Sequence, residues 1–208
     1  YIDIRVGASS FDGNGLLWTT TGFVNNLKSY SPSNKQWKSY SLNAVISDAS
    51  DNPGFADIVI GNDGTKWLAA SFNFGLIGFN ENNGKTLIKN IYKEEDNMPT
   101  SFVTALALDK RNQLWIGTFN GLRVLYNTSN FFEGNAKVDE IIILEDGIAK
   151  ELLFQQFITK IRVDGSNNKW IGTADSGLFY LSSDGQKTIY HFTKDNSPLP
   201  SNTVIDVS

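Results

Sequence analysis

Three short segments of this chain together supply aromatic rings and amide, carboxylate or hydroxyl groups: 72–74 (FNF) and 119–120 (FN) supply rings and amides, and 175–176 (DS) supplies a carboxylate and a hydroxyl. Aromatic faces stack on the apolar faces of sugars, and amides and carboxylates hydrogen-bond to hydroxyls, so this mixture is typical of a saccharide site. A second interpretation is that the phenylalanines pack between neighbouring structural units. The sequence leaves both open. The candidate ligand-binding residues are Phe72, Asn73, Phe74, Phe119, Asn120 and Asp175.

The sequence offers no convergent set of catalytic residues. His191 is the only histidine and the chain has no cysteine, so neither a zinc site of Cys and His ligands nor a Cys-His pair can form. The acidic groups at 94–96 and 139–140 are of the type that glycosidases use, but they fall in a connector and at the start of an outer strand, which are usually solvated positions. We therefore expect no enzymatic activity and no cofactor.

Turn segments rich in Asp, Asn and Gly occur at 62–64, 164–168 and 184–185. They lack the alternating carboxylates and the closing glutamate of an EF-hand calcium loop. Asn, Asp and Gly tolerate the backbone of tight turns. The segments are therefore interpreted as hairpin turns, and no metal site is expected.

Phe131 and Phe132 stand next to each other inside a polar insert at 127–137. Adjacent aromatic residues in such a loop are typical of a protein contact, which makes the pair candidate partner-binding residues. The alternative is that the insert folds back onto the edge of its own sheet.

A sequence repeat supplies the elements that must position these groups. The segments LWTTTGF, KWLAASFNFGLIGF, LWIGTFNGLRVL and KWIGTADSGLFYL place Trp18, Trp67, Trp115 and Trp170 at intervals of 49, 48 and 55 residues. A repeat of about 50 residues built from short strands is typical of propeller blades. A large aromatic residue at a fixed position of each repeat predicts a core role for the four tryptophans.

Pairs of apolar residues before each tryptophan predict the innermost strand of each blade. These pairs are Ile4/Val6, Ile58/Ile60, Leu106/Leu108 and Ile161/Val163, with five extra residues near 9–13 in the first blade. Outermost strands are predicted at 37–40, 87–92, 141–144 and 188–192. Residues 150–157 come closest to a helical pattern, and at most one turn is expected there.

The predicted fold is an all-β propeller of four-stranded antiparallel blades. The blades cover approximately 1–43, 54–97, 102–145 and 157–197, and a fifth begins at 203–208. Four blades and one extra inner strand predict an arc of a larger propeller of about seven blades. Because the sequence begins and stops inside predicted strands, we expect a fragment of a longer polypeptide.

Composition excludes several classes of function. The 208 residues include 18 basic and 22 acidic side chains, a formal net charge of -4 without any Lys/Arg run, so nucleic-acid binding is not expected. No apolar stretch approaches the ~18 residues that a membrane span requires. The absence of cysteine excludes disulfides.

Two of the repeats carry a family resemblance. The segments KWIGTADSGLFYL and LWIGTFNGLRVL, together with LPSN at 199–202, resemble the two-component regulator propeller repeat. The resemblance covers essentially the whole chain. It implies a propeller of the kind found in extracytoplasmic sensor regions of hybrid histidine kinases and in surface proteins of Bacteroidetes.

Within that family, the C-terminal part of the chain resembles the propellers of PorZ-like proteins. The resemblance rests on the turn and strand at 164–170, on HFT at 191–193 and on NSPL at 196–199. It implies a non-enzymatic recognition or docking propeller in the periplasm or at the cell surface, acting as an accessory of type IX secretion and surface attachment. The implied partners are a sortase-like protein and an anionic lipopolysaccharide or oligosaccharide. The alternative is a periplasmic propeller of a hybrid histidine kinase that senses an oligosaccharide.

Overall fold

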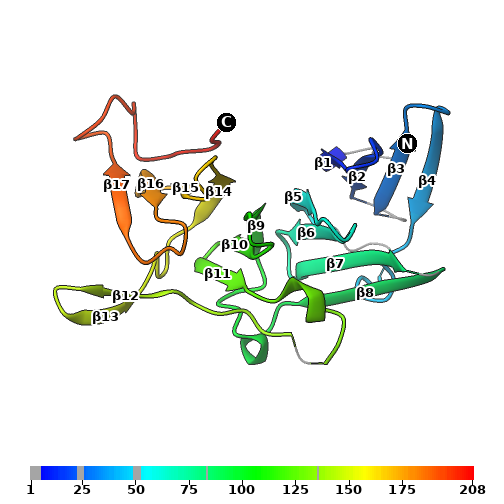
Figure 1. Cartoon of the computed structure of the whole chain (residues 1–208), viewed down its shortest axis with the longest axis horizontal. Helices are drawn as coiled ribbons and strands as arrows, with labels where there is room; N and C mark the ends of the chain where they lie inside the picture. The colour runs from blue at the N-terminus through cyan, green and yellow to red at the C-terminus, as the bar shows by residue number, and fades with distance from the viewer. Residues whose placement is uncertain (1–5, 23–25, 49–52, 83, 135) are drawn as a thin grey trace.

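Four antiparallel sheets follow one another along the chain and stand side by side around an open arc (Figure 1). The structure is a computed structural model that describes residues 6–22, 26–48, 53–82, 84–134 and 136–208. The first strands of the four sheets are neighbours along the inner side of the arc. This arrangement confirms the predicted all-β fold of antiparallel blades forming part of a propeller.

Each sheet takes its strands in sequence order, so every connection within it is a hairpin. The first sheet contains β1 (Val6–Phe11), β2 (Leu17–Thr21), β3 (Leu27–Ser31) and β4 (Gln36–Tyr40), and the second contains β5 (Phe55–Ile60), β6 (Lys66–Ala70), β7 (Gly75–Asn82) and β8 (Lys85–Ile91). The third contains β9 (Val103–Leu108), β10 (Leu114–Thr118) and β11 (Gly121–Leu125), and the fourth contains β14 (Ile158–Val163), β15 (Lys169–Thr173), β16 (Leu178–Leu181) and β17 (Thr188–Phe192). Two short 3-10 helices, η1 (Glu94–Asp96) and η2 (Thr128–Asn130), lie in connectors.

The core consists of three apolar layers, one between each pair of neighbouring sheets. Trp18 lies in the layer between the first and second sheets, Trp67 in the next layer and Trp115 in the last, and each is at most 2% exposed. Trp170 lies on the open face of the fourth sheet, where it stacks on Tyr180 and is only half-buried. Burial of a tryptophan therefore depends on the presence of a following sheet.

Glycine in the second strand lets the next sheet approach closely. A Cβ added to Gly117 would lie 2.5 Å from Cγ2 of Ile158, and one added to Gly172 would lie 2.9 Å from Cγ1 of Val204. Residues 203–208 form no strand, yet Val204 contacts Gly172 as Ile158 contacts Gly117. The end of the chain thus runs along the fourth sheet in the place that the first strand of a following blade would take.

The first sheet differs from the predicted register. β1 pairs with β2 so that Ser9 lies opposite Thr19 and Phe11 lies opposite Leu17. Ser9 and Phe11 therefore replace Ile4 and Val6 as the equivalents of the other apolar pairs, and no extra residues are inserted at 9–13. The prediction missed this register because Ser9 and Ser10 are polar, whereas it relied on pairs of apolar residues. Ile4 lies within residues 1–5, which are outside the described residues.

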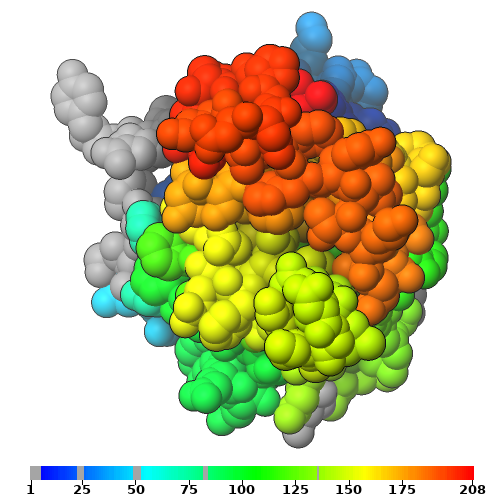
Figure 2. Space-filling view, turned by 90° about the vertical axis from the view of Figure 1, so that its left-hand side faces the viewer, coloured from blue at the N-terminus to red at the C-terminus, as the bar shows by residue number. Residues whose placement is uncertain are grey.

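The third sheet lacks the fourth strand predicted at 141–144. Val138 packs on one side of this sheet and Ile141 on the other, while Asp139 forms a single bridge to Val124. The chain then leaves the sheet and forms a separate hairpin of β12 (Ile142–Glu145) and β13 (Ile148–Glu151). β13 includes the first two residues of the segment 150–157, where at most one helical turn was expected. Figure 2 shows this yellow-green hairpin on the surface beside the fourth sheet.

The turn between the first and second strands has the same construction in all four sheets. It spans five residues, 12–16, 61–65, 109–113 and 164–168, and each copy contains the same two backbone hydrogen bonds. The fourth residue of each copy has a left-handed backbone. These residues are Gly15, Gly64, Asn112 and Asn167. The turn interpretation of 62–64 and 164–168 agrees with these bonds.

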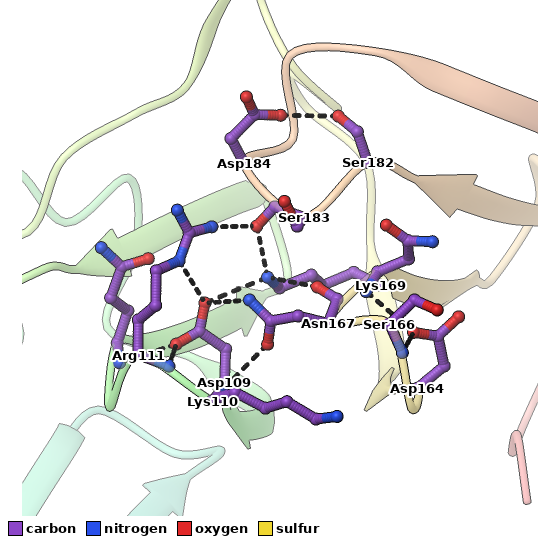
Figure 3. A network of polar contacts seen from close by, with 12 residues as sticks. Asp109, Lys110, Arg111, Asp164, Ser166, Asn167, Lys169, Ser182, Ser183 and Asp184 are labelled. Carbon is purple, nitrogen blue, oxygen red and sulfur yellow. Dashed lines mark hydrogen bonds and ion pairs between the residues drawn. The ribbon is translucent and has the colours of Figure 1, made fainter.

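An aspartate opens three of the four turns and uses both carboxylate oxygens within the protein. Asp12 Oδ1 accepts hydrogen bonds from two backbone N–H groups of its own turn, and Asp12 Oδ2 accepts one from Nε1 of Trp18 at 2.9 Å. In the third sheet, Asp109 Oδ2 instead accepts from Lys169 and Asn167 of the fourth sheet (Figure 3). Trp115 Nε1 is consequently buried without an acceptor among the described residues.

These aspartates predict a loss of stability in acid. Burial alone raises the pKa of Asp12, but hydrogen bonds from Trp18 and Leu16 bring the pKa below its ordinary value. Asp109 behaves alike, since bonds from Gln113 and Lys169 outweigh burial and lower its pKa. A lowered folded-state pKa contributes stability that is present above the unfolded value of about 3.9 and is lost as pH falls through the folded value. Urea unfolding should show a free energy that declines below about pH 4.

The Asp12→Asn variant provides the control for acid sensitivity. It cannot titrate at this position, so its unfolding free energy should decline less between about pH 5 and pH 3 than that of the wild-type protein. Parallel pH profiles of the two proteins would show that Asp12 has the same pKa folded and unfolded.

Candidate functional site

An apolar cleft of about 540 Å³ lies at the end of the sheets where the second strands turn into the third. Phe72 comes from the loop after β6 and Phe119 from the loop after β10. Phe102 and Phe157 directly precede β9 and β14, and Ile205 comes from the C-terminal segment. Segments of three sheets and the C-terminal segment thus converge on one cleft.

Three of the four aromatic rings of the cleft, those of Phe102, Phe119 and Phe157, form a connected group. The ring centroid of Phe119 lies 4.8 Å from that of Phe157 and 6.4 Å from that of Phe102. Phe72 and Phe119 are 52% and 56% exposed. Phenyl rings held by neighbouring aromatics while still open to solvent are suited to stacking on a ligand.

Hydroxyl groups around the cleft are already used within the protein. Ser71 Oγ donates to the carbonyl of Val103 at 3.1 Å, and Thr104 Oγ1 donates to the carbonyl of Ile158. The cleft therefore offers apolar contact and stacking and few free donors. A ligand with an extended apolar face fits this lining better than one recognised mainly through hydrogen bonds.

The structure brings together only two of the predicted ligand-binding residues. Phe72 and Phe119 line the cleft, whereas Phe74 packs against the apolar layer between the first two sheets. The side chain of Asn73 accepts a hydrogen bond from Ser101 Oγ at 3.3 Å, and Asp175 Oδ1 accepts one from Ser176 Oγ at 3.0 Å.

Asn120, the remaining candidate, lies outside the cleft lining. Its backbone N–H donates to Thr118 Oγ1 at 3.0 Å, a contact that closes its own loop. Asn73, Phe74, Asn120 and Asp175 thus have roles in loop and core structure and do not line the cleft.

Phe102 and Phe157 were not predicted, although the repeat contains the signal that identifies them. Each lies 13 residues before the tryptophan of its own sheet, at Trp115 and Trp170. The corresponding position in the second sheet is Gly54, where an added Cβ would clash with the ring of Phe72. Comparing equivalent positions outside the strands would have revealed this aromatic pair.

The predicted partner-binding pair is part of the core instead. Phe131 is 0% exposed and meets Trp67 edge to face, with ring centroids 4.8 Å apart. Phe132 is partly buried against the same layer. The insert folds back because the third sheet has no fourth strand, which leaves the apolar layer beside Trp67 to be covered by these rings. A side chain without exposed surface offers nothing to a partner.

The remaining polar candidates are dispersed. Glu140 accepts a hydrogen bond from Asn97 Nδ2 at 2.6 Å, and this bond lowers the pKa of Glu140 below its ordinary value. His191 Nε2 contacts the carbonyl of Ser176 while its ring stacks on Phe179. In the part of the chain that the structure describes, no cluster of three or more His, Cys, Asp or Glu side chains could hold a metal ion.

The fold and the repeat together define a β-propeller segment, and comparison with known proteins specifies it further. Residues 97–120 match the family model described as two component regulator propeller. No curated protein matches the sequence. The resemblance to this repeat is thus confirmed by the family model at its third copy.

Among solved structures, PorZ from Porphyromonas gingivalis is similar to this chain. It is described as an essential bacterial surface component of the type IX secretion system, and it aligns with a TM-score of 0.83 and 27% identity over 97% of this chain and 29% of PorZ. The resemblance to PorZ propellers is confirmed by this likeness. The extracellular domain assigned to the hybrid two component system BT3049 of B. thetaiotaomicron aligns with a TM-score of 0.67 and 17% identity, over 99% of this chain and 24% of that one.

A propeller enzyme also shares the fold. Virginiamycin B lyase from Staphylococcus aureus aligns with a TM-score of 0.60 and 12% identity over 88% of this chain and 54% of the lyase. The chain therefore spans less than two thirds of each of these structures. No helix among the described residues combines the length and apolar character needed to cross a bilayer.

Proposed function

We propose that this chain is a non-enzymatic recognition segment of an extracytoplasmic, PorZ-like propeller that assists type IX secretion and surface attachment. The observation that carries the proposal is the similarity to PorZ along nearly the whole chain, at 27% identity. The dispersed acidic groups support a binding role over catalysis, because hydrolysis or elimination needs an acid and a base that converge on one substrate.

The cleft of phenylalanines is the proposed contact site. Its exposed rings suit the apolar face of a sugar in an anionic lipopolysaccharide or an apolar side chain of a sortase-like partner. Calorimetry and pull-down with the full-length protein test both partners. Failure of both would contradict the secretion role.

The Phe119→Ala variant tests the cleft directly. Loss of a central aromatic contact should weaken binding of the glycan or the sortase about tenfold. Because Phe119 is 56% exposed, the melting temperature should change little. Phe154→Ala is the matched control, since Phe154 is also 56% exposed and does not line the cleft. Equal affinities of the two variants would exclude the cleft as the contact site.

A second candidate function is ligand sensing in a hybrid two-component histidine kinase. The match at 97–120 and the likeness to the BT3049 extracellular domain favour it. This function predicts that the full-length protein binds a free oligosaccharide and does not bind a sortase. The same calorimetric experiment therefore separates the two functions.

A further inference from the structure

A second cleft lies at the opposite end of the sheets, between the β1–β2 turn and the β5–β6 turn. It has a volume of about 440 Å³, and its lining includes Asp12, Gly13, Gly64 and Lys66. The turns between first and second strands and the loops between second and third strands lie at opposite ends of the sheets. This cleft is therefore on a different part of the surface from the phenylalanine cleft.

At the equivalent place between the third and fourth sheets, the side chain of Asn167 lies between the two turns (Figure 3). Its Oδ1 accepts a hydrogen bond from the backbone N–H of Lys110 at 2.8 Å, and its Nδ2 donates to Asp109 Oδ2 at 3.3 Å. A primary carboxamide thus joins the two turns, offering an acceptor to one group and a donor to its neighbour.

The turns of the first two sheets have the same backbone but lack this carboxamide. Gly64 takes the position of Asn167, with a φ of 81° against 68°, and a Cβ added to Gly64 would meet nothing within 4 Å. Asp12 takes the position of Asp109, and Gly13 that of Lys110. The N–H of Gly13 has no acceptor in the described part of the chain.

Lys66 is a second hydrogen-bond donor in the cleft lining, and it supports ligand binding independently of the turn comparison. Its equivalent, Lys169, donates hydrogen bonds to Asp109, Asn167 and Ser183. Lys66 is only 7% exposed and lies over the ring of Trp18, with Nζ 3.9 Å from the centroid. It forms no hydrogen bond or ion pair with the described residues. The ammonium remains accessible from the cleft, so it is free to donate a hydrogen bond to a group bound there.

We propose that this cleft binds a primary carboxamide, the side chain of an asparagine or glutamine in a polypeptide partner, in the place that Asn167 takes two interfaces further along the chain. The ligand oxygen accepts from the N–H of Gly13 and from the Lys66 ammonium, and the ligand NH₂ donates to Asp12 Oδ2. The carboxylates of Asp12 and Asp63 disfavour an anionic ligand at the same position.

Two small probes test the chemistry of the proposed site. N-acetyl-asparagine methylamide carries the primary carboxamide, and N-acetyl-leucine methylamide has the same two backbone amides and a side chain of nearly the same shape without polar atoms. We expect saturable NMR shifts of the Gly13 amide and the Trp18 indole N–H with the asparagine probe, at an affinity about tenfold above that of the leucine probe. Equal affinity of the probes, or no shift, overturns the proposal, as does saccharide binding at the cleft without asparagine binding.

The Gly64→Asn variant tests the geometry from within the protein. Its new carboxamide should occupy the cleft, remove binding of the asparagine probe and raise the melting temperature by about 2–4 °C. Gly15→Asn is the matched control, because Gly15 has the same turn position, a φ of 78° and open space around its Cβ, but does not line the cleft. Unchanged probe binding in Gly64→Asn, or equal melting temperatures in the two variants, overturns the proposal.

Discussion

Replacing Lys169 by methionine is expected to lower the free energy of unfolding by about 3 kcal/mol, because it removes the nearer and fully buried cation from the Asp109 carboxylate and leaves only Arg111, whose Nε lies 3.7 Å from Oδ2. The side chains of Lys169 and Asp109 are both 0% exposed, and Nζ lies 3.1 Å from Oδ2. Asp109 keeps backbone donors from Arg111 and Gln113, which places the expected loss at the lower end of the range for a broken buried pair. Equilibrium unfolding in urea measures it.

Lys66→Met is the matched control for this loss. Lys66 occupies the equivalent position and lies over Trp18 as Lys169 lies over Trp115, but it forms no ion pair with the described residues. The substitution removes the cation–π contacts with Trp18 and Phe79, at a cost of about 1 kcal/mol. The double variant Lys169→Met/Asp109→Asn should recover part of the stability, since a neutral amide in place of the carboxylate no longer needs the missing ammonium. Equal losses from the two lysine variants would contradict the role of the Asp109 pair.

Replacing Trp67 by alanine is expected to cost about 3–5 kcal/mol, whereas Trp170→Ala should cost about half as much. The two tryptophans hold the same place in the repeat. Trp67 is 1% exposed between two sheets and contacts Phe131, while Trp170 is covered on one face only. The loss follows the volume of the cavity that remains.

Urea unfolding of both variants provides the comparison. In Trp170→Ala, Tyr180 can move into part of the cavity, and solvent can enter from the open face of the sheet. The two sheets around Trp67 cannot close the cavity in this way. Equal losses at the two positions would contradict the placement of Trp170 at an open end of the arc.

The two clefts have different consequences for the molecule. The phenylalanine cleft is assembled from loops and from the residues that precede the inner strands, so its lining changes with loop sequence while the sheets stay constant. The second cleft, between the β1–β2 and β5–β6 turns, has Gly13, Asn14 and Gly64 where the third and fourth sheets have Lys110, Arg111 and Asn167.

Most of the fold was predictable because its determinants are local. The tryptophan strand, the glycine that follows it and the five-residue turn recur in each repeat, and antiparallel neighbours along the chain pair through short connections. The prediction failed in the first sheet, where Ser9 and Ser10 replace apolar residues. It failed again at 141–144, where the chain spans two apolar layers with a single bridge to β11.

The propeller repeat and the turn chemistry could be predicted from the amino-acid sequence, since they depend on residue types at fixed local spacing, and the net charge of -4 follows from composition. Which aromatic residues are free to bind became clear from the packing of the sheets, because it depends on contacts between segments far apart in the chain. Phe119 and Phe131 both lie in polar loops, yet one lines a cleft and the other is sealed against Trp67. The effect of Gly64 in place of Asn167 likewise depends on the neighbouring sheet. Asn167 forms its hydrogen bonds with Lys110 and Asp109 in the turn of the preceding repeat, about 50 residues earlier in the chain.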